Sequence, residues 1–178
     1  MVKSSKSIVL GGGCFWCLEA SFQLIIGVVK VEPGYSGGKQ EEANYDAVCA
    51  GLTNHAEVVK VTFDTTKINL GEVLDIFWAI HDPTTPDRQG NDIGRQYRSV
   101  IFYSEDEQLV TIQDSIKKTQ ALWKDVIVTQ VEKLEEFYPA EEYHHDYFKN
   151  NPEKAYCQVI INPKLSKLRA DFAHRIKG

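Results

Sequence analysis

The chain is predicted to be an α+β protein with a mixed, mainly antiparallel sheet. Two observations predict this class. Short runs of apolar and β-branched residues, typical of strands, alternate with longer segments whose apolar residues recur at helical spacing. The order strand–helix–strand occurs twice in succession, and no internal repeat or low-complexity tract interrupts the 178 residues. Together they favour one domain with one core over residues 1–178.

The first half of the chain supplies one strand–helix–strand unit and the strand that follows it. Residues 8–10 form a short apolar run that predicts a buried strand, and the glycines at 11–13 permit a sharp turn after it. The remaining elements expected in this half are a helix over 18–26, a strand over 27–32, a turn or long loop over 33–38, a loop with one helical turn over 44–54, and a β-branched strand over 55–63.

The second half begins with a helix over 70–81, which Asn69 caps and Asp82-Pro83 ends. A long polar loop follows at 84–97, and such loops are often functional. The order of elements resembles the split βαβ arrangement of ferredoxin-like α/β sandwiches, with additional helices. The later elements are a strand over 98–103, a helix from a Ser104–Glu107 capping box to about 123, a strand over 125–132, a short helix over 140–149, an extended piece over 156–161, and a helix over 165–176.

Composition narrows the possible functions. The chain is 43% hydrophobic and 25% charged, as in soluble globular proteins. A net charge of -5 without a basic run argues against nucleic-acid binding, and no apolar segment is long enough to span a bilayer. The apolar run after Lys3 and Lys6 is too short for a signal peptide, so the four cysteines indicate reduced or catalytic thiols. We expect a cytoplasmic monomer that binds neither nucleic acid nor membrane.

Cys14 is the first candidate for chemistry. It follows the glycine turn and precedes a predicted helix, where unpaired N–H groups and the helix dipole favour a thiolate. One alternative is a small buried cysteine, which the glycines and the nearby Cys17 argue against. Another is half of a zinc site, but Cys49, Cys157, His55 and the His144-His145 pair are not at ligand spacing. A nucleophilic or redox thiol is favoured.

Several polar and aromatic residues are candidates to assist Cys14. Each has a structural alternative: a carboxylate at a strand end can be solvated, an Asp in a turn can be local turn chemistry, and aromatic rings can be core. The candidates are Glu57 at the start of an apolar strand, Asp92 in the long loop, the loop tyrosines Tyr45 and Tyr97, and Phe15 and Trp16 beside the thiol.

The sequence resembles the type A peptide-methionine (S)-S-oxide reductase family. The resemblance begins at Gly13-Cys14-Phe15-Trp16 and runs in order from about 7 to 157, which suggests a core over 7–157 and a C-terminal helical extension over 158–178. The further matching blocks are Gly34-Tyr35-Ser36-Gly37-Gly38, Tyr45 to Glu57, His81-Asp82-Pro83-Thr84, Gln89 to Ser99, and Ala140-Glu141-x-Tyr143-His144.

The resemblance implies a chemistry for these residues. Cys14 would attack the sulfur of methionine sulfoxide and become a sulfenic acid, while Glu57 would protonate the sulfoxide oxygen. Asp92 would organise the substrate or a bridging water. Such a site would select the S epimer and repair oxidised proteins or free methionine sulfoxide, with thioredoxin, or dithiothreitol in vitro, as reductant and no bound cofactor or metal. The tyrosines Tyr45 and Tyr97 would hydrogen-bond the oxygen, and Phe15 and Trp16 would hold the S-methyl group.

Two cysteines are candidates to resolve the sulfenic acid. Cys17 stands where many relatives carry glycine, and a position three residues on along a helix can reach Cys14. Cys157 stands where many relatives place a resolving cysteine, but it requires the tail to fold over the site. We favour Cys17 first, with Cys157 as a possible relay toward thioredoxin. Cys49 is expected to be a structural thiol, and His144 and His145 surface or packing residues.

Two rival functions remain open at this point. Cys14 and Cys17 could serve a dithiol oxidoreductase acting on protein disulfides, or the chain could be a non-enzymatic redox or metal-binding module. Neither rival gives Glu57 or the loop tyrosines a role.

Overall fold

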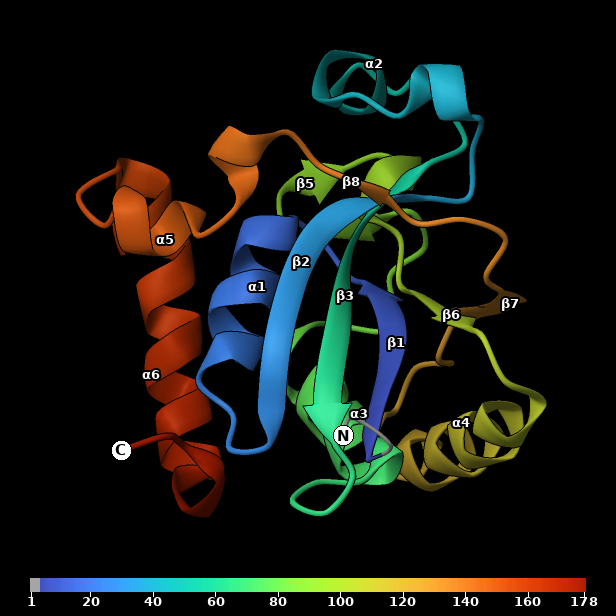
Figure 1. The fold of residues 1–178 in the computed structure, drawn as a ribbon, viewed down its shortest axis with the longest axis vertical. Helices are drawn as coiled ribbons and strands as arrows, with labels where there is room; N and C mark the ends of the chain where they lie inside the picture. Colours follow the sequence, from blue (N-terminus) through green and yellow to red (C-terminus); the bar gives the residue numbers. More distant parts are fainter. Residues whose placement is uncertain (1–3) are drawn as a thin grey trace.

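The protein is a twisted sheet with helices packed against it, as the computed structural model shows for residues 4–178 (Figure 1). The strands within this range are β1 (Ser5–Gly11), β2 (Val28–Ser36), β3 (Ala56–Asp64), β4 (Arg88–Gln89), β5 (Asp92–Ile93), β6 (Val100–Tyr103), β7 (Gln130–Lys133) and β8 (Tyr138–Pro139).

The main sheet has the strand order β7-β6-β1-β3-β2-β8, and β4 pairs with β5 in a separate hairpin. Strand β3 is antiparallel to both β1 and β2, and β6 is antiparallel to β1. Strand β8 is antiparallel to β2, whereas β7 is parallel to β6. The four central strands β6-β1-β3-β2 therefore form the split βαβ arrangement, and the prediction of a ferredoxin-like α+β sandwich with a mainly antiparallel sheet is confirmed.

Helices α1 and α3 pack against one face of this sheet, and α6 lies beside α1 at the edge of the molecule (Figure 1). Among residues 4–178, no helix is both long and apolar enough to cross a membrane. The α-helices are α1 (Phe15–Gln23), α2 (Tyr45–Cys49), α3 (Leu70–Ile80), α4 (Asp106–Gln120), α5 (Tyr147–Asn150) and α6 (Asn162–Asp171). Short 3₁₀ turns are η1 (Gln40–Glu42), η2 (Arg95–Tyr97), η3 (Glu142–His144) and η5 (Ala173–Arg175), and η4 (Cys157–Ile161) is π-helical.

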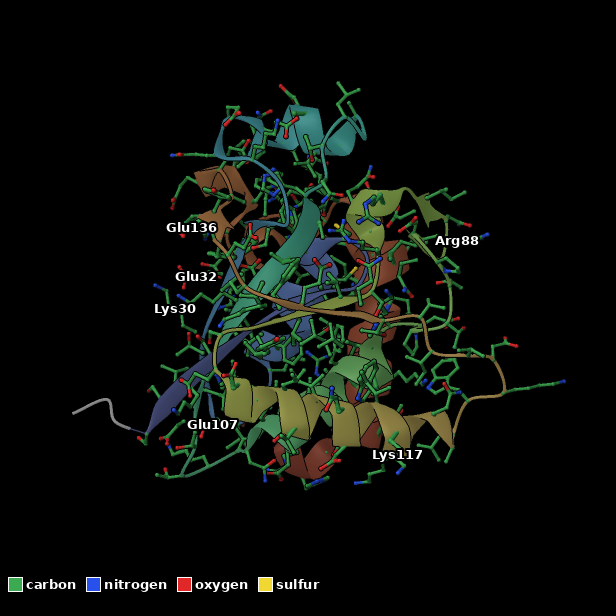
Figure 2. The ribbon with its side chains drawn as sticks, turned by 90° about the vertical axis from the view of Figure 1, so that its right-hand side faces the viewer. Lys30, Glu32, Arg88, Glu107, Lys117 and Glu136 are labelled. Carbon is green, nitrogen blue, oxygen red and sulfur yellow. The ribbon has the colours of Figure 1, made fainter. Side chains whose placement is uncertain are left out.

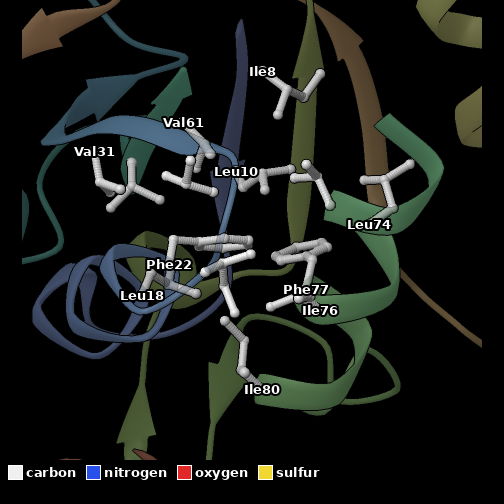
Figure 3. Close-up of a cluster of buried hydrophobic side chains, with 14 of the residues drawn as sticks. Ile8, Leu10, Leu18, Phe22, Val31, Val61, Leu74, Ile76, Phe77 and Ile80 are labelled. Atoms are coloured by element: carbon white, nitrogen blue, oxygen red, sulfur yellow. The ribbon is translucent and has the colours of Figure 1, made fainter. Parts of the chain in front are cut away.

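The main core lies between the sheet and helices α1 and α3 (Figure 3). Leu10 of β1 and Val61 of β3 meet Phe22 of α1 and Phe77 of α3, and all four side chains are fully buried. Each such side chain contributes about 1.5–3 kcal/mol through removal of apolar surface from water. This packing fixes the start of α1 relative to β3, the strand that carries Glu57.

The opposite face of the sheet is covered by an irregular segment. Val9, Val58 and Phe102 form a smaller buried cluster there, against which Leu134 and Phe137 pack. Charged side chains project outward over the rest of the surface, for example from β2, β4 and α4 (Figure 2). Both faces of the central strands are thus buried, which agrees with their continuous apolar runs.

Several predicted boundaries differ from the structure. Helix α1 begins at Phe15, three residues earlier than expected, because Cys14 occupies the N-cap position. Strand β2 continues through residues 33–36, predicted as a turn, because β3 and β8 pair with it there. Strand β7 begins at Gln130 and not at 125, and the capping box of α4 is Glu105 with Gln108, not Ser104 with Glu107.

The C-terminal predictions were less accurate. The extended piece predicted over 156–161 is wrong, because Cys157–Ile161 is helical and continues directly into α6. The single helix predicted over 140–149 is divided into η3 and α5 by Asp146, whose backbone is left-handed at φ +54°. The last helix covers Asn162–Asp171 and is followed by a 3₁₀ turn. Packing against α1 determines this region.

The predicted cap of α3 is confirmed and offers a test of stability. The Asn69 side chain accepts a hydrogen bond from the Glu72 amide at 2.9 Å, and Glu72 accepts one from the Asn69 amide at 3.1 Å. Asn69→Ala is expected to lower the free energy of unfolding by about 1 kcal/mol in urea titrations. Asn69→Ser keeps a capping oxygen, so its free energy of unfolding should fall by only a few tenths of a kcal/mol. Equal losses in the two variants would contradict the capping role.

Candidate active site

Cys14 lies at the junction of the glycine turn and helix α1, as predicted. Gly13 has φ +92°, a conformation that favours glycine, and its amide donates to the Tyr97 carbonyl at 3.2 Å. Cys14 is the N-cap, and its carbonyl accepts the first helical hydrogen bond from the Cys17 amide at 3.1 Å. The turn therefore presents the Cys14 side chain at the N-terminus of a helix and ties it to the loop that carries Tyr97.

The predicted shift of Cys14 toward a thiolate is wrong for this structure. Burial of the side chain raises the pKa of the Cys14 thiol well above its ordinary value, and the negative charges of ionised Glu57 and Cys17 raise it further. The Trp16 amide and the Tyr156 hydroxyl lower the pKa, but they do not outweigh burial. The helix N-terminus is thus present, yet Cys14 keeps its proton at neutral pH until a base removes it.

Glu57 is a buried carboxylic acid beside the thiol. Its side chain is 2% exposed, and Oε1 accepts a hydrogen bond from the Phe15 amide at 3.2 Å. Burial raises the pKa of Glu57 to about 8, the Phe15 amide opposes this effect, and the nearby Asp92 adds to it. The alternative of a solvated strand-end residue is therefore wrong. At neutral pH Glu57 is mostly protonated and can donate a proton.

Tyr45 and Tyr97 both lie near this acid. Burial, together with the charges of Glu57, Cys49 and Cys14, raises the pKa of both phenols, so they remain hydrogen-bond donors. The Tyr45 ring stacks on the Phe15 ring with centroids 6.5 Å apart. The structure therefore brings the two loop tyrosines, Glu57 and Cys14 into one region.

Phe15 and Trp16 are not equivalent. Phe15 is fully buried, whereas Trp16 is half-buried. The Trp16 ring stacks on Tyr147 with centroids 3.7 Å apart and an interplanar angle of 6°. Its indole N–H donates to Nδ1 of His144 at 3.0 Å. Trp16 is therefore held in a fixed orientation beside Cys14, while Phe15 supports the site from the core.

His144 has a larger role in the site than its sequence context indicated. It is fully buried, and its ring lies 4.4 Å from Tyr45 and 5.0 Å from Phe15, measured between centroids. Because Nδ1 accepts the Trp16 hydrogen bond, the proton of a neutral His144 lies on Nε2. His145 is half-buried and bonds the Ala140 carbonyl at 3.0 Å. His144 and His145 were predicted to be surface or packing residues. For His144 the packing alternative is confirmed and the surface alternative is wrong.

A cavity of about 450 Å³ opens at Cys14. Asp92 lies in its wall, as does Tyr156, which comes from the C-terminal segment and which sequence reasoning missed. The Tyr156 hydroxyl donates to Oδ2 of Asp92 at 3.3 Å and lies 3.6 Å from Sγ of Cys17. The residues that line the cavity are Cys14, Gln89, Gly90, Asn91, Asp92, Tyr156, Ile160 and Lys164.

The four cysteines are all thiols in this structure, and three of them gather at α1. Cys17 and Cys157 are buried in one cluster, against which Cys14 packs. The tail therefore does fold over the site, as a role for Cys157 requires. Cys49 is exposed at the end of α2, and its interpretation as a structural thiol stays a prediction. Within residues 4–178, no group of three His, Cys, Asp or Glu side chains is arranged to hold a metal ion.

Comparisons with known proteins agree with this site. A family model described as peptide methionine sulfoxide reductase matches residues 6–176. The peptide methionine sulfoxide reductase MsrA of Psychrobacter sp. (strain PRwf-1) is 56% identical over 94% of this chain and 96% of its own. The reduced form of Mxr1 from Saccharomyces cerevisiae has a TM-score of 0.82 at 36% identity, covering 86% of this chain and 90% of that one. Mxr1 in complex with Trx2 has a TM-score of 0.59 at 28% identity, covering 80% and 85%. The chain therefore belongs to the peptide methionine sulfoxide reductase family.

Proposed function

We propose that this protein reduces the S epimer of methionine sulfoxide, free or in proteins, and so repairs oxidative damage. The observation that carries the proposal is the buried Glu57 carboxyl near Cys14, whose Oε1 accepts a hydrogen bond from the amide of Phe15, the residue that follows Cys14. Its burial raises the pKa of this carboxyl to about 8, which keeps a proton available at neutral pH. Sulfoxide oxygen leaves poorly unless it is protonated, and a thiol alone does not supply this proton. Family membership supports the substrate class.

The reaction follows from the two protonated groups. Glu57 gives its proton to the sulfoxide oxygen while the Cys14 sulfur attacks the substrate sulfur, and the proton of Cys14 returns to the Glu57 carboxylate. The oxygen is transferred to Cys14 as a sulfenic acid, and methionine leaves. Atoms and charge balance, because Glu57 ends protonated and Cys14 carries the oxygen and one proton.

The surrounding residues position the substrate. Tyr45 and Tyr97 donate hydrogen bonds to the sulfoxide oxygen, which their protonated phenols permit. Asp92 orients the substrate or a bridging water at the wall of the cavity. Trp16 is held by Tyr147 and His144 and contacts the S-methyl group. Phe15 packs beside Trp16 on the core side of the site. A site that fixes oxygen and methyl separately selects one epimer.

Cys17 then attacks the sulfenic acid, which forms a Cys14–Cys17 disulfide and releases water. Cys157 then receives the disulfide from Cys17 and passes it outward, which its position in the same buried cluster supports. We propose thioredoxin as the reductant, with dithiothreitol as its substitute in vitro, because the related yeast Mxr1 has been solved in complex with Trx2.

The cavity and the thiols also bear on the oligomeric state of the protein and on its location in the cell. We propose that it acts as a single-domain monomer, because the cavity at Cys14 is lined from β4, the loop to β5 and the C-terminal segment of one chain. Free thiols suit a reducing compartment, which supports the cytoplasm as its location.

A single-turnover assay tests this function. The reduced protein is mixed with each separated epimer of methionine sulfoxide in the absence of a reductant, and the products are followed by chromatography and peptide mass spectrometry. We expect about one equivalent of methionine from the S epimer, none from the R epimer, and a disulfide that includes Cys14. Reduction of insulin disulfides without reduction of either epimer would favour a dithiol oxidoreductase instead.

The resolving role of Cys17 has its own test. Cys17→Ser is expected to form methionine once and then stop, with a sulfenic acid that dimedone traps at Cys14, because in the proposed relay Cys157 reacts with the Cys14–Cys17 disulfide and not with the sulfenic acid itself. Cys157→Ser is the matched variant and should still form the Cys14–Cys17 disulfide in a single turnover. Steady-state rates with thioredoxin that fall only for Cys157→Ser would make Cys157 the first resolving cysteine.

A further inference from the structure

The hydroxyl of Tyr156 connects the two parts of the proposed reaction. It lies 3.6 Å from Sγ of Cys17 and donates a hydrogen bond to Oδ2 of Asp92 at 3.3 Å. Because the hydroxyl hydrogen is directed to Asp92, the Tyr156 oxygen is free to accept from the Cys17 S–H. The three groups form a directed chain from Cys17 through Tyr156 to Asp92, and Asp92 lines the cavity at Cys14.

Packing of the C-terminal segment holds this hydroxyl in place. The Tyr156 ring contacts Trp16 edge-on, with centroids 5.7 Å apart and an interplanar angle of 77°. The next residue, Cys157, is fully buried, and Leu165 of α6 packs in the same cluster against α1. Tyr156 is therefore fixed between the helix that carries both thiols and the loop that carries Asp92.

The resolution step needs a proton acceptor at this position. Cys17 is 3% exposed, and burial raises the pKa of its thiol, so water has little access and the thiolate is scarce. The leaving hydroxyl of a sulfenic acid on Cys14 needs a proton in the same step. A group that touches Cys17 and is hydrogen-bonded to the cavity wall can serve both needs.

We propose that Tyr156 accepts the proton of Cys17 as this thiol attacks the sulfenic acid on Cys14. The S–S bond forms between Cys17 and Cys14, and the S–O bond of Cys14 breaks. The proton passes from Cys17 to the Tyr156 oxygen, the Tyr156 proton passes to Asp92, and the leaving hydroxide takes a proton from Asp92 to become water. The proposal rests on the proposed function, because it assigns a residue to the resolution step of that reaction.

Lys164 does not replace Tyr156 in this step. It lines the same cavity, and its positive charge lowers the pKa of Cys17, which favours the thiolate. A protonated ammonium group has no acceptor, however, so it cannot take the proton from the thiol. The carboxylate of Asp92 can accept a proton, but it reaches Cys17 only through the Tyr156 hydroxyl.

The test compares Tyr156→Phe with Tyr103→Phe, a matched removal of a phenol oxygen on β6, outside the cavity. Each reduced variant is mixed with one equivalent of the S epimer, and methionine formation and loss of dimedone-reactive sulfenic acid are timed separately. For Tyr156→Phe we expect methionine formation to slow somewhat, because this hydroxyl also contacts Asp92 and lowers the pKa of Cys14. Disulfide formation should slow by at least about tenfold more than methionine formation does. Raising the pH should restore the disulfide rate as Cys17 ionises. Tyr103→Phe should match the parent in both steps.

The two measured steps separate the possible failures. No methionine from the parent protein would overturn the proposed function itself. Normal methionine formation with an unchanged disulfide rate in Tyr156→Phe would overturn the role of Tyr156 alone, and so would a parent disulfide between Cys14 and Cys157. A slow disulfide step that pH does not restore would show that Tyr156 only packs the C-terminal segment.

Discussion

Replacing Cys14 by serine is expected to lower the rate of methionine formation from the S epimer by at least about 10³-fold. A serine hydroxyl is a much weaker nucleophile than a thiol, and burial beside Glu57 opposes its ionisation as it opposes that of Cys14. The substitution keeps the N-cap position, so helix α1 should form as before. The measurement is single-turnover chromatography of methionine, with the melting temperature as a check of folding.

Cys49→Ser is the matched control, because it exchanges the same atom at an exposed position at the end of α2. Its single-turnover rate should stay within about twofold of the parent, since surface substitutions are mostly mild. A Cys14→Ser rate within tenfold of the parent would show that another group attacks the sulfur, and the assignment of the nucleophile would then fail.

The position of Cys14 was predictable because local sequence determines it. An apolar strand, a glycine turn and a helix start lie within about a dozen residues, and each follows from backbone preferences. Its pKa was not predictable in this way. The helix N-terminus is visible in the sequence, but the burial that outweighs it arises from packing that the motif does not reveal.

Residues brought in by tertiary contacts were the ones that sequence reasoning missed. Tyr156 reaches Cys17 across 139 positions of sequence, and His144 reaches Trp16 across 128. Neither has a local pattern that indicates a site. The wrong elements over 156–161 and 140–149 also lie in segments that pack on α1, so tertiary contacts and not local periodicity decide their form. The resemblance to a family placed His144 in a matching block, and that was the available signal.

Glu57→Gln is expected to slow methionine formation by about 10²–10³-fold, because the amide keeps the shape of the side chain but cannot give a proton. Its oxygen can still accept the hydrogen bond from the Phe15 amide, so the turn at Cys14 should be preserved. In the parent protein the rate should fall as pH rises through about 8, where Glu57 ionises. The Gln variant should lack this decline. The measurement is a pH profile of single-turnover rates from pH 6 to 9.5.

Glu32→Gln on β2 is the control, because it removes a surface carboxylate that pairs with Lys30 on the same strand. Its pH profile should follow that of the parent. A decline near pH 8 that persists in Glu57→Gln would assign this titration to another group. Loss of folding in Glu57→Gln would return Glu57 to a structural role.

Glu57→Gln should also make the protein more stable than the parent at high pH. The Glu57 carboxyl has a pKa of about 8 in the folded protein against an ordinary value of 4.5, so the unfolded chain releases this proton first as pH rises. The free energy of unfolding therefore falls between about pH 4.5 and 8. Above pH 8 it is lower than below pH 4.5 by on the order of 3–5 kcal/mol. Urea unfolding at pH 5 and pH 9 should show a smaller decline for Glu57→Gln than for the parent, and an equal decline would mean that Glu57 is not held protonated. Such a gain in stability, joined to a loss of activity, is expected of a buried acid retained for catalysis, because the burial that destabilises its charged form is also what keeps the proton available for the sulfoxide.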